Sequence, residues 1–185
     1  MKIVRTIASI VTLTVLAALV GTAIAVPAEP AVVDTSTISI LAAGTLSITA
    51  PANVNLGSTR ASGTLTGSLG TVTVSDTRGN LVAAWTATVS STDFTTGPAT
   101  PAATIGKANI RYWSGTATAT SGVGVFIAGQ GTASSAVVLS TTRTAFNLTA
   151  GVGNNSASWK PTVIVTVPAT ALSGTYTGTI THSVA

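Results

Sequence analysis

The amino-acid sequence predicts an all-β fold, an antiparallel β-sandwich of the Ig-like or Greek-key type with about eight to ten strands. Three observations lead to this prediction. Apolar residues recur at a spacing of two, the period of a strand with one buried face. Gly, Asn and Pro interrupt these runs, and no window has the 3.6-residue repeat of an amphipathic helix. Thr and Val are frequent, and β-branched residues favour strands.

The expected strands cover residues 44–50, 68–76, 81–90, 108–114, 122–128, 135–141, 144–149, 159–167 and 175–184. Residues 77–80 are expected to form a hairpin turn, because Gly79 and Asn80 adopt positive φ at low cost. Asp76 and Arg78 flank this turn and can form an ion pair. Residues 95–107 and 115–124 are low in complexity, which indicates loops.

The N-terminus has the three parts of a secretory signal peptide over residues 1–25. Lys2 and Arg5 form its basic end, an apolar run covers 7–20, and residues 23–25 are a small-residue cleavage site. An uncleaved membrane anchor is the alternative, because the apolar run is about long enough to span a bilayer if cleavage does not occur. If the signal is cleaved, we expect a secreted protein that is extracellular or associated with the cell wall and no longer contacts the membrane.

Cleavage leaves an extended leader at 26–37, rich in Pro and Ala, and one domain at 38–185. The chain contains no Cys, so it has neither a disulfide framework nor a thiolate metal site. Its remaining basic residues are few and scattered, without a patch of interleaved aromatic residues. This distribution excludes nucleic acid as an expected partner.

Two motifs of the chain are distinctive. The first is the turn Asp76-x-Arg78-Gly79, followed by a strand with Trp85 and by Asp93-Phe94. The second is the closing strand from Tyr176, which contains His182 and Val184. Together they resemble the WxL domain of Gram-positive surface proteins, with His182 and Val184 at the positions of the family's Trp and Leu. The resemblance spans residues 44–185. It implies a secreted, β-rich, non-enzymatic module that attaches non-covalently to the cell wall, through peptidoglycan or another wall glycan.

Trp113 is the strongest candidate for contact with a ligand. It shares strand parity with Asn109 and Arg111 on the polar face, whereas Tyr112 points the other way. A Trp beside an Arg can stack on a sugar ring and bind an anionic group. Lys107 and Tyr112 are lesser candidates for the same glycan contact. The alternative is that other parts of the fold cover this face.

The remaining aromatic residues are expected to be structural. Trp85 and Trp159 lie on the apolar parity of their strands and are predicted to anchor the core. Tyr176 follows Pro168 in the manner of a tyrosine that closes a Greek-key corner. His182 shares parity with apolar neighbours, which favours a packed, hydrogen-bonded histidine.

No catalytic centre, metal site or cofactor is expected. His182 is the only histidine, and the sequence has no Gly-x-Ser-x-Gly elbow for a serine nucleophile. Asp76 and Asp93 occupy turn and loop positions rather than flanking a cleft as glycosidase carboxylates do. A weak calcium site built from carbonyl groups near either Asp is the one metal alternative.

Two functions follow from these features. The first is a secreted cell-surface protein that binds the wall or other surface proteins. The alternative is a structural subunit that assembles through exposed sheet edges, because the chain has few charges to protect such edges. In that alternative the leader at 26–37 can donate a strand to a neighbour.

Overall fold

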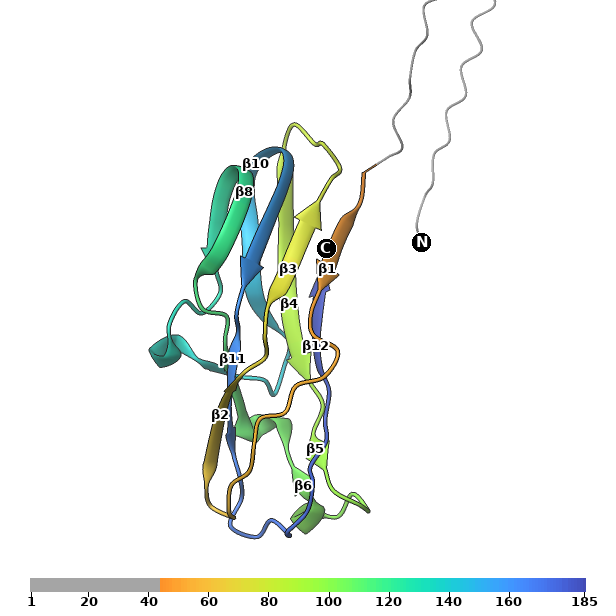
Figure 1. Cartoon of the computed structure of the whole chain (residues 1–185), viewed down its shortest axis with the longest axis vertical. Helices are drawn as coiled ribbons and strands as arrows, with labels where there is room; N and C mark the ends of the chain where they lie inside the picture. Colours follow the sequence, from red (N-terminus) through yellow and green to blue (C-terminus); the bar gives the residue numbers. More distant parts are fainter. Residues whose placement is uncertain (1–43) are drawn as a thin grey trace, which may run out of the picture. The chain divides into compact units, whose positions relative to one another are not determined.

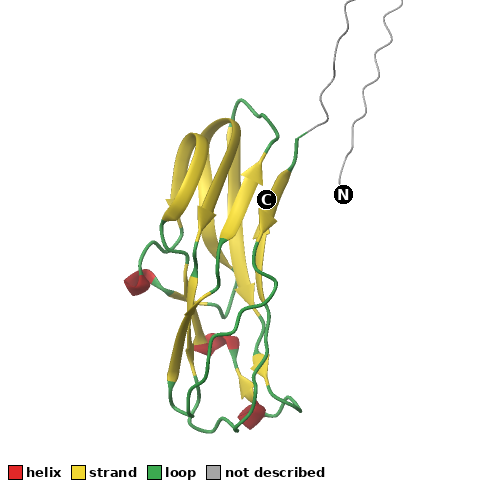
Figure 2. Cartoon of the chain, in the orientation of Figure 1, coloured by secondary structure: helices red, strands yellow, loops and turns green. Residues whose placement is uncertain are grey.

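The computed structural model describes residues 44–185, so the predicted signal peptide and the leader at 26–37 lie outside the described residues. The described chain is all-β, with antiparallel strands arranged in two packed layers (Figure 1). Its only helical segments are the short 3-10 turns Pro101–Ala103, Lys107–Asn109 and Ala133–Ser135 (Figure 2). The predicted class, an antiparallel β-sandwich, is confirmed.

The strands are β1 Leu46–Thr49, β2 Thr64–Ser68, β3 Val72–Asp76, β4 Ala83–Ser91, β5 Phe94–Thr95, β6 Thr104–Ile105, β7 Ile110–Trp113, β8 Ala117–Ala128, β9 Val137–Val138, β10 Arg143–Trp159, β11 Thr162–Thr166 and β12 Ile180–Val184. They form a larger sheet of order β1-β3-β10-β4-β12, to which β8 is added beside β10. A smaller sheet has the order β2-β11-β7-β9, and β5 pairs with β6.

The long strand β10 belongs to the larger sheet but folds over, so that its first half lies in one of the two packed layers and its second half in the other. Its first half pairs with β4 and its second half with β3, while β8 accompanies it through both halves. The two strands fold over at the top of Figure 1, so the halves of each strand face one another across the core. Positive φ angles at Gly122, Gly124, Ala150 and Gly153 produce this bend.

The segment between β3 and β4 crosses from one layer to the other. β3 pairs with β1 and β10, whereas β4 pairs with β10 and β12. The predicted hairpin turn at 77–80 is therefore wrong, because the two strands that it joins are not partners. Gly79 has the positive φ expected there, 66°.

Two predicted loops contain strands. Residues 117–121, expected within a loop, are the first part of β8, which continues into the predicted strand 122–128, and residues 104–105 within the other expected loop form β6. Most of the first part of β8 is exposed, so it lacks the apolar parity that identifies a strand. The strand β2 and the middle of β10 also lie outside the predicted strands, because they are rich in Thr, Gly, Asn and Ser.

The molecule has an upper half, formed by the larger sheet, and a lower half, formed by the smaller sheet with β5, β6 and the segments 50–63 and 168–179 (Figure 1). In the upper half β1 pairs with β3 and also contacts β12, so the larger sheet nearly closes like a barrel. In the lower half the segment 50–63 occupies this side without forming a strand. Because no strand closes the lower half in this way, a groove opens there.

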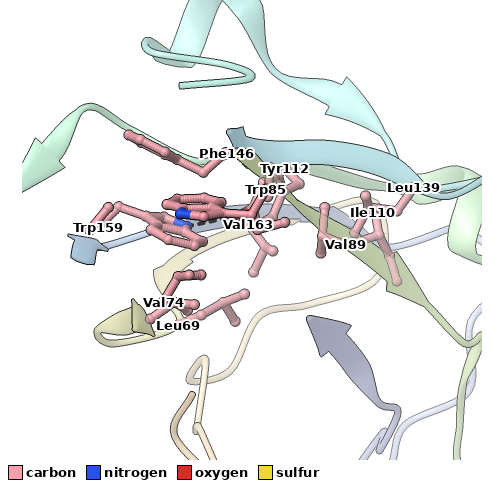
Figure 3. Close-up of a cluster of buried hydrophobic side chains, with 14 of the residues drawn as sticks. Leu69, Val74, Trp85, Val89, Ile110, Tyr112, Leu139, Phe146, Trp159 and Val163 are labelled. Atoms are coloured by element: carbon pink, nitrogen blue, oxygen red, sulfur yellow. Dashed lines mark hydrogen bonds between the residues drawn. The ribbon is translucent and has the colours of Figure 1, made fainter. Parts of the chain in front are cut away.

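Aromatic side chains from both layers fill the upper core. Trp159 is fully buried and stacks on Phe146, with ring centroids 4.9 Å apart (Figure 3). Trp85 is also buried and packs at an angle against Phe126. The predicted core positions of Trp85 and Trp159 are confirmed, and burial of such large side chains is the main stabilising contribution here.

Candidate functional site

The strand β7 places Trp113 and Arg111 on the outer face of the smaller sheet. Ile110 and Tyr112 are fully buried, whereas Arg111 is exposed and Trp113 is half-buried. This alternation agrees with the parity predicted from the sequence. Because Trp113 and Arg111 are alternate residues of one strand, both are accessible on the same side of the sheet and lie next to each other there.

Hydroxyl side chains surround this pair on the same face. Trp113 lies opposite Thr162, which lies opposite Ser68 on β2. In the neighbouring row Arg111 lies opposite Ile164, which lies opposite Thr66. We call the face formed by these six residues the Trp113 face: it presents one aromatic ring, one cation and several hydroxyl groups.

The other predicted contact residues differ in their placement. Arg111 donates a hydrogen bond from Nη2 to the carbonyl oxygen of Ala136 at 2.8 Å, which fixes the guanidinium above the sheet. Lys107 is exposed on the 3-10 turn before β7, and its backbone N–H donates to Oδ1 of Asp93 at 2.7 Å. Tyr112 is fully buried on the inner face, so its assignment as a glycan contact is wrong.

Tyr112 instead joins a polar chain with Trp159, which is fully buried, and His182, which is partly buried. Its hydroxyl lies 3.2 Å from Nε2 of His182, and Nε1 of Trp159 donates to it at 3.4 Å. Burial lowers the pKa of His182 to about 4 and raises the pKa of Tyr112. His182 is therefore neutral at pH 7 and serves as a packed hydrogen-bonding partner that holds β12 against β7, as expected from the sequence.

The Asp76–Arg78 pair is present and more enclosed than the sequence indicated. Asp76 is 1% exposed and receives Nε and Nη2 of Arg78, each at 2.9 Å. Asn155 donates to the same carboxylate at 3.4 Å and accepts Nε1–H of Trp85 at 2.7 Å. Hydrogen bonds from Arg78 lower the pKa of Asp76. This network links β3, β4 and β10, and sequence reasoning missed Asn155 because it is distant in the chain.

Both Asp carboxylates accept hydrogen bonds within the described chain. The carboxylate of Asp76 is occupied by Arg78 and Asn155, and Asp93 accepts the Lys107 backbone N–H. Among residues 44–185 no three His, Asp or Glu side chains gather as ligands for a metal ion. The arrangement therefore gives no support to the calcium alternative.

A groove of about 1060 Å³ opens in the lower half. The segment 51–61 and residues 171–180 form its two walls, and apolar side chains from both layers form its floor, among them Leu65, Phe94 and Val165. Tyr176 shapes the rim, because its hydroxyl lies within hydrogen-bond distance of the carbonyl oxygens of Leu172, at 2.9 Å, and Ala102, at 3.1 Å. This is the corner arrangement predicted for Tyr176. Sequence reasoning missed the groove because its walls come from segments distant in the chain.

A second apolar surface follows the edge strand β8, which pairs only with β10 among the described strands. Val123, Val125 and Ile127 are exposed along it, and no charged residue occurs between Arg111 and Arg143. An uncharged edge of this length leaves backbone groups free to pair with another strand. Two strand edges in the described part of the chain, that of β2 beside the groove and that of β8, thus have no strand partner.

No protein-family model matches this chain, and no curated protein is significantly similar to it in sequence. None of the helical segments within residues 44–185 has the length and apolar character to cross a bilayer. Function is therefore inferred from the surfaces described above.

Proposed function

We propose that the protein is an exported, non-enzymatic cell-surface protein that associates non-covalently with cell-wall glycan, with peptidoglycan as its first ligand. The observation that supports this proposal is the Trp113 face, where a half-buried Trp and an exposed Arg lie among hydroxyl side chains. The WxL-like motifs around Asp76 and His182 favour the same function.

The chemistry of the Trp113 face suits a repeating, weakly charged polymer. The indole ring offers an apolar surface for the C–H face of a sugar, and the hydroxyl groups of Thr162 and Ser68 can exchange hydrogen bonds with sugar hydroxyls. Arg111 adds a fixed cation for a carboxylate of the wall. Each contact is modest, so many copies along one glycan strand would provide the retention.

A pelleting experiment tests this proposal. The exported chain is mixed with insoluble Gram-positive peptidoglycan, and the pelleted fraction is measured at low and high salt. We expect pelleting to require the wall and to fall for Trp113→Ala and Arg111→Ala. Val125→Ala is the matched control, because Val125 is exposed on the β8 edge away from this face. Protein that stays in solution with the wall present would exclude the proposal.

A second candidate function is a structural subunit that assembles through strand addition. The groove of the lower half and the uncharged β8 edge favour it, since both leave backbone groups without strand partners in the described chain. Assembly does not exclude wall binding, because the Trp113 face lies on the outer side of the smaller sheet.

A further inference from the structure

We propose that the lower groove binds residues 36–42 of a second copy of this chain as an added β-strand. This inference deepens the assembly candidate and rests on it. The groove accepts the strand, residues 36–42 of the next copy donate it, and the copies are arranged head to tail.

The groove has the geometry of a sheet that lacks one strand. Next to the wall formed by the segment 51–61, β2 pairs only with β11 among the described strands, so its other edge has no strand partner. On the other wall the backbone of Thr177 exchanges hydrogen bonds with Thr95 on one side only. Leu65, Val165 and Phe94 lie between these edges. In the upper half β1 occupies the corresponding place, where it contacts strands of both layers.

The sequence of residues 36–42, Ser-Thr-Ile-Ser-Ile-Leu-Ala, suits this place. Ile38 and Ile40 alternate with Thr37 and Ser39, so one face of an extended segment is apolar and the other is polar. The segment carries no charge and no Pro, and both Ile residues are β-branched. When it is added as a strand, its backbone pairs with a free edge and its Ile side chains cover the apolar floor.

Chain length assigns the donor to a second copy. The described chain begins at Gly44 in the upper half, where Thr45 pairs with Thr77, and β1 runs from there toward the groove. From Gly44 to Pro51, the first groove residue, an extended chain covers roughly 23 Å. From Gly44 back to Ile38 it covers about 20 Å. Within one copy the segment therefore reaches no further than the near end of the groove.

The donor segment precedes Gly44, which lies in the upper half, whereas the acceptor groove lies in the lower half. A contact of this kind is heterologous, because the two surfaces that meet are different. Each added copy brings a new donor segment and a new groove. The result is an open row of copies rather than a closed dimer.

Disulfide trapping tests the register of this contact, because the chain contains no Cys of its own. The exported chain is prepared as Ile40→Cys and, separately, as Leu172→Cys, a 55% exposed position at the groove rim. After mixing and mild oxidation we expect a disulfide-linked heterodimer. The control partner is Leu81→Cys, which is 83% exposed but lies in the upper half, and for which we expect no comparable product.

Two outcomes of the trapping experiment would overturn the inference. Equal linkage of Ile40→Cys to both partners would show collision rather than docking. A chain carrying both Ile40→Cys and Leu172→Cys that closes an internal disulfide and stays monomeric would show that the segment fills its own groove.

Sedimentation of Ile38→Asp/Ile40→Asp separates this inference from the assembly candidate. The two positions precede the described domain, so loss of the fold is not expected to complicate the result. We expect the concentration-dependent oligomers of the unmodified chain to disappear. Oligomers that persist in this variant but disappear with Val125→Asp would place assembly at β8 and overturn the groove inference alone. An unmodified chain that is monomeric at every concentration would overturn both.

Discussion

The upper and lower halves of the domain are built from the same layers but differ in how they are closed. In the upper half β1 joins the edges of the two layers, and beneath it Val72, Val74 and Trp159 are completely buried. In the lower half the segment 50–63 takes that side without strand pairing, and Leu65 and Phe94 stay partly exposed. One short strand thus separates a sealed core from an open groove.

This comparison shows that an apolar interior alone does not complete a sandwich. The strands of both halves carry the same alternation of Val, Ile and Leu with Thr and Ser. What the lower half lacks is a partner for two free edges, and backbone groups in a sheet contribute fully only when they are paired. The upper half is therefore expected to determine stability, and the lower half to determine association.

The largest expected effect is on the upper core. Trp159→Ala removes a fully buried indole stacked on Phe146, and we expect the free energy of unfolding to fall by about 3–5 kcal/mol. Trp113→Ala is the matched control, with an expected loss under about 1 kcal/mol because Trp113 is half-buried. Urea denaturation measures both values. Equal losses would contradict the assignment of stability to the upper core.

The second effect is a pH dependence from His182. Burial lowers its pKa in the folded chain from the ordinary value of 6.5 to about 4, so the unfolded chain binds the proton first as pH falls. Stability should therefore decrease from pH 6.5 to about 4, by at most about 3 kcal/mol. His182→Gln, which stays neutral, should remove most of this slope in thermal melts. An unchanged slope would assign the acid sensitivity to other groups.

The third effect concerns the network that joins the layers. Asp76→Ala leaves Arg78 and Asn155 without their carboxylate, and we expect a loss of about 1–3 kcal/mol, moderated because Arg78 is partly exposed. Because the folded pKa of Asp76 is lowered, this contribution is complete above the ordinary Asp pKa and is lost at lower pH. Asp93→Ala, at an exposed residue, is the comparison in the same denaturation assay. A smaller loss for Asp76→Ala would contradict the role of the network.

The smallest effect on stability is expected at the groove rim. Leu172→Ala and Val54→Ala alter exposed side chains and should change the unfolding free energy by under about 0.5 kcal/mol. Both should nevertheless weaken the association of copies, as measured by sedimentation. A large loss of stability with unchanged association would reverse the roles that we assign to the two halves.

The sequence predicts those parts of the fold in which one face of a strand is buried. The alternation in β4 and β7 identified both strands and the inward positions of Trp85 and Tyr112. The same reasoning missed the first part of β8, because an edge strand exposed on both faces carries no alternation. It also divided β10, because the Gly- and Asn-rich residues 150–155 form a bend, with positive φ at Ala150 and Gly153, rather than the end of a strand.

The candidate sites also differ in how far the sequence predicts them. Trp113 and Arg111 were found because two positions on one strand share a face by parity alone. The groove was not found, because its floor combines β2, β5, β6 and β11, whose proximity depends on the order of strands in the sheets. Likewise Asn155 meets Asp76 only through the pairing of β10 with β3. Spatial proximity of this kind is set by topology, which local patterns do not encode.

The double membership of β10 has a consequence for the rate of folding. Its partners β3, β4 and β8 all precede it in the chain, and neither layer can be completed before its residues are present. Folds dominated by such distant pairings form slowly, on a scale of about milliseconds to seconds. For a chain that is exported, as we propose, slow folding is useful, because the polypeptide stays unfolded while it crosses the membrane.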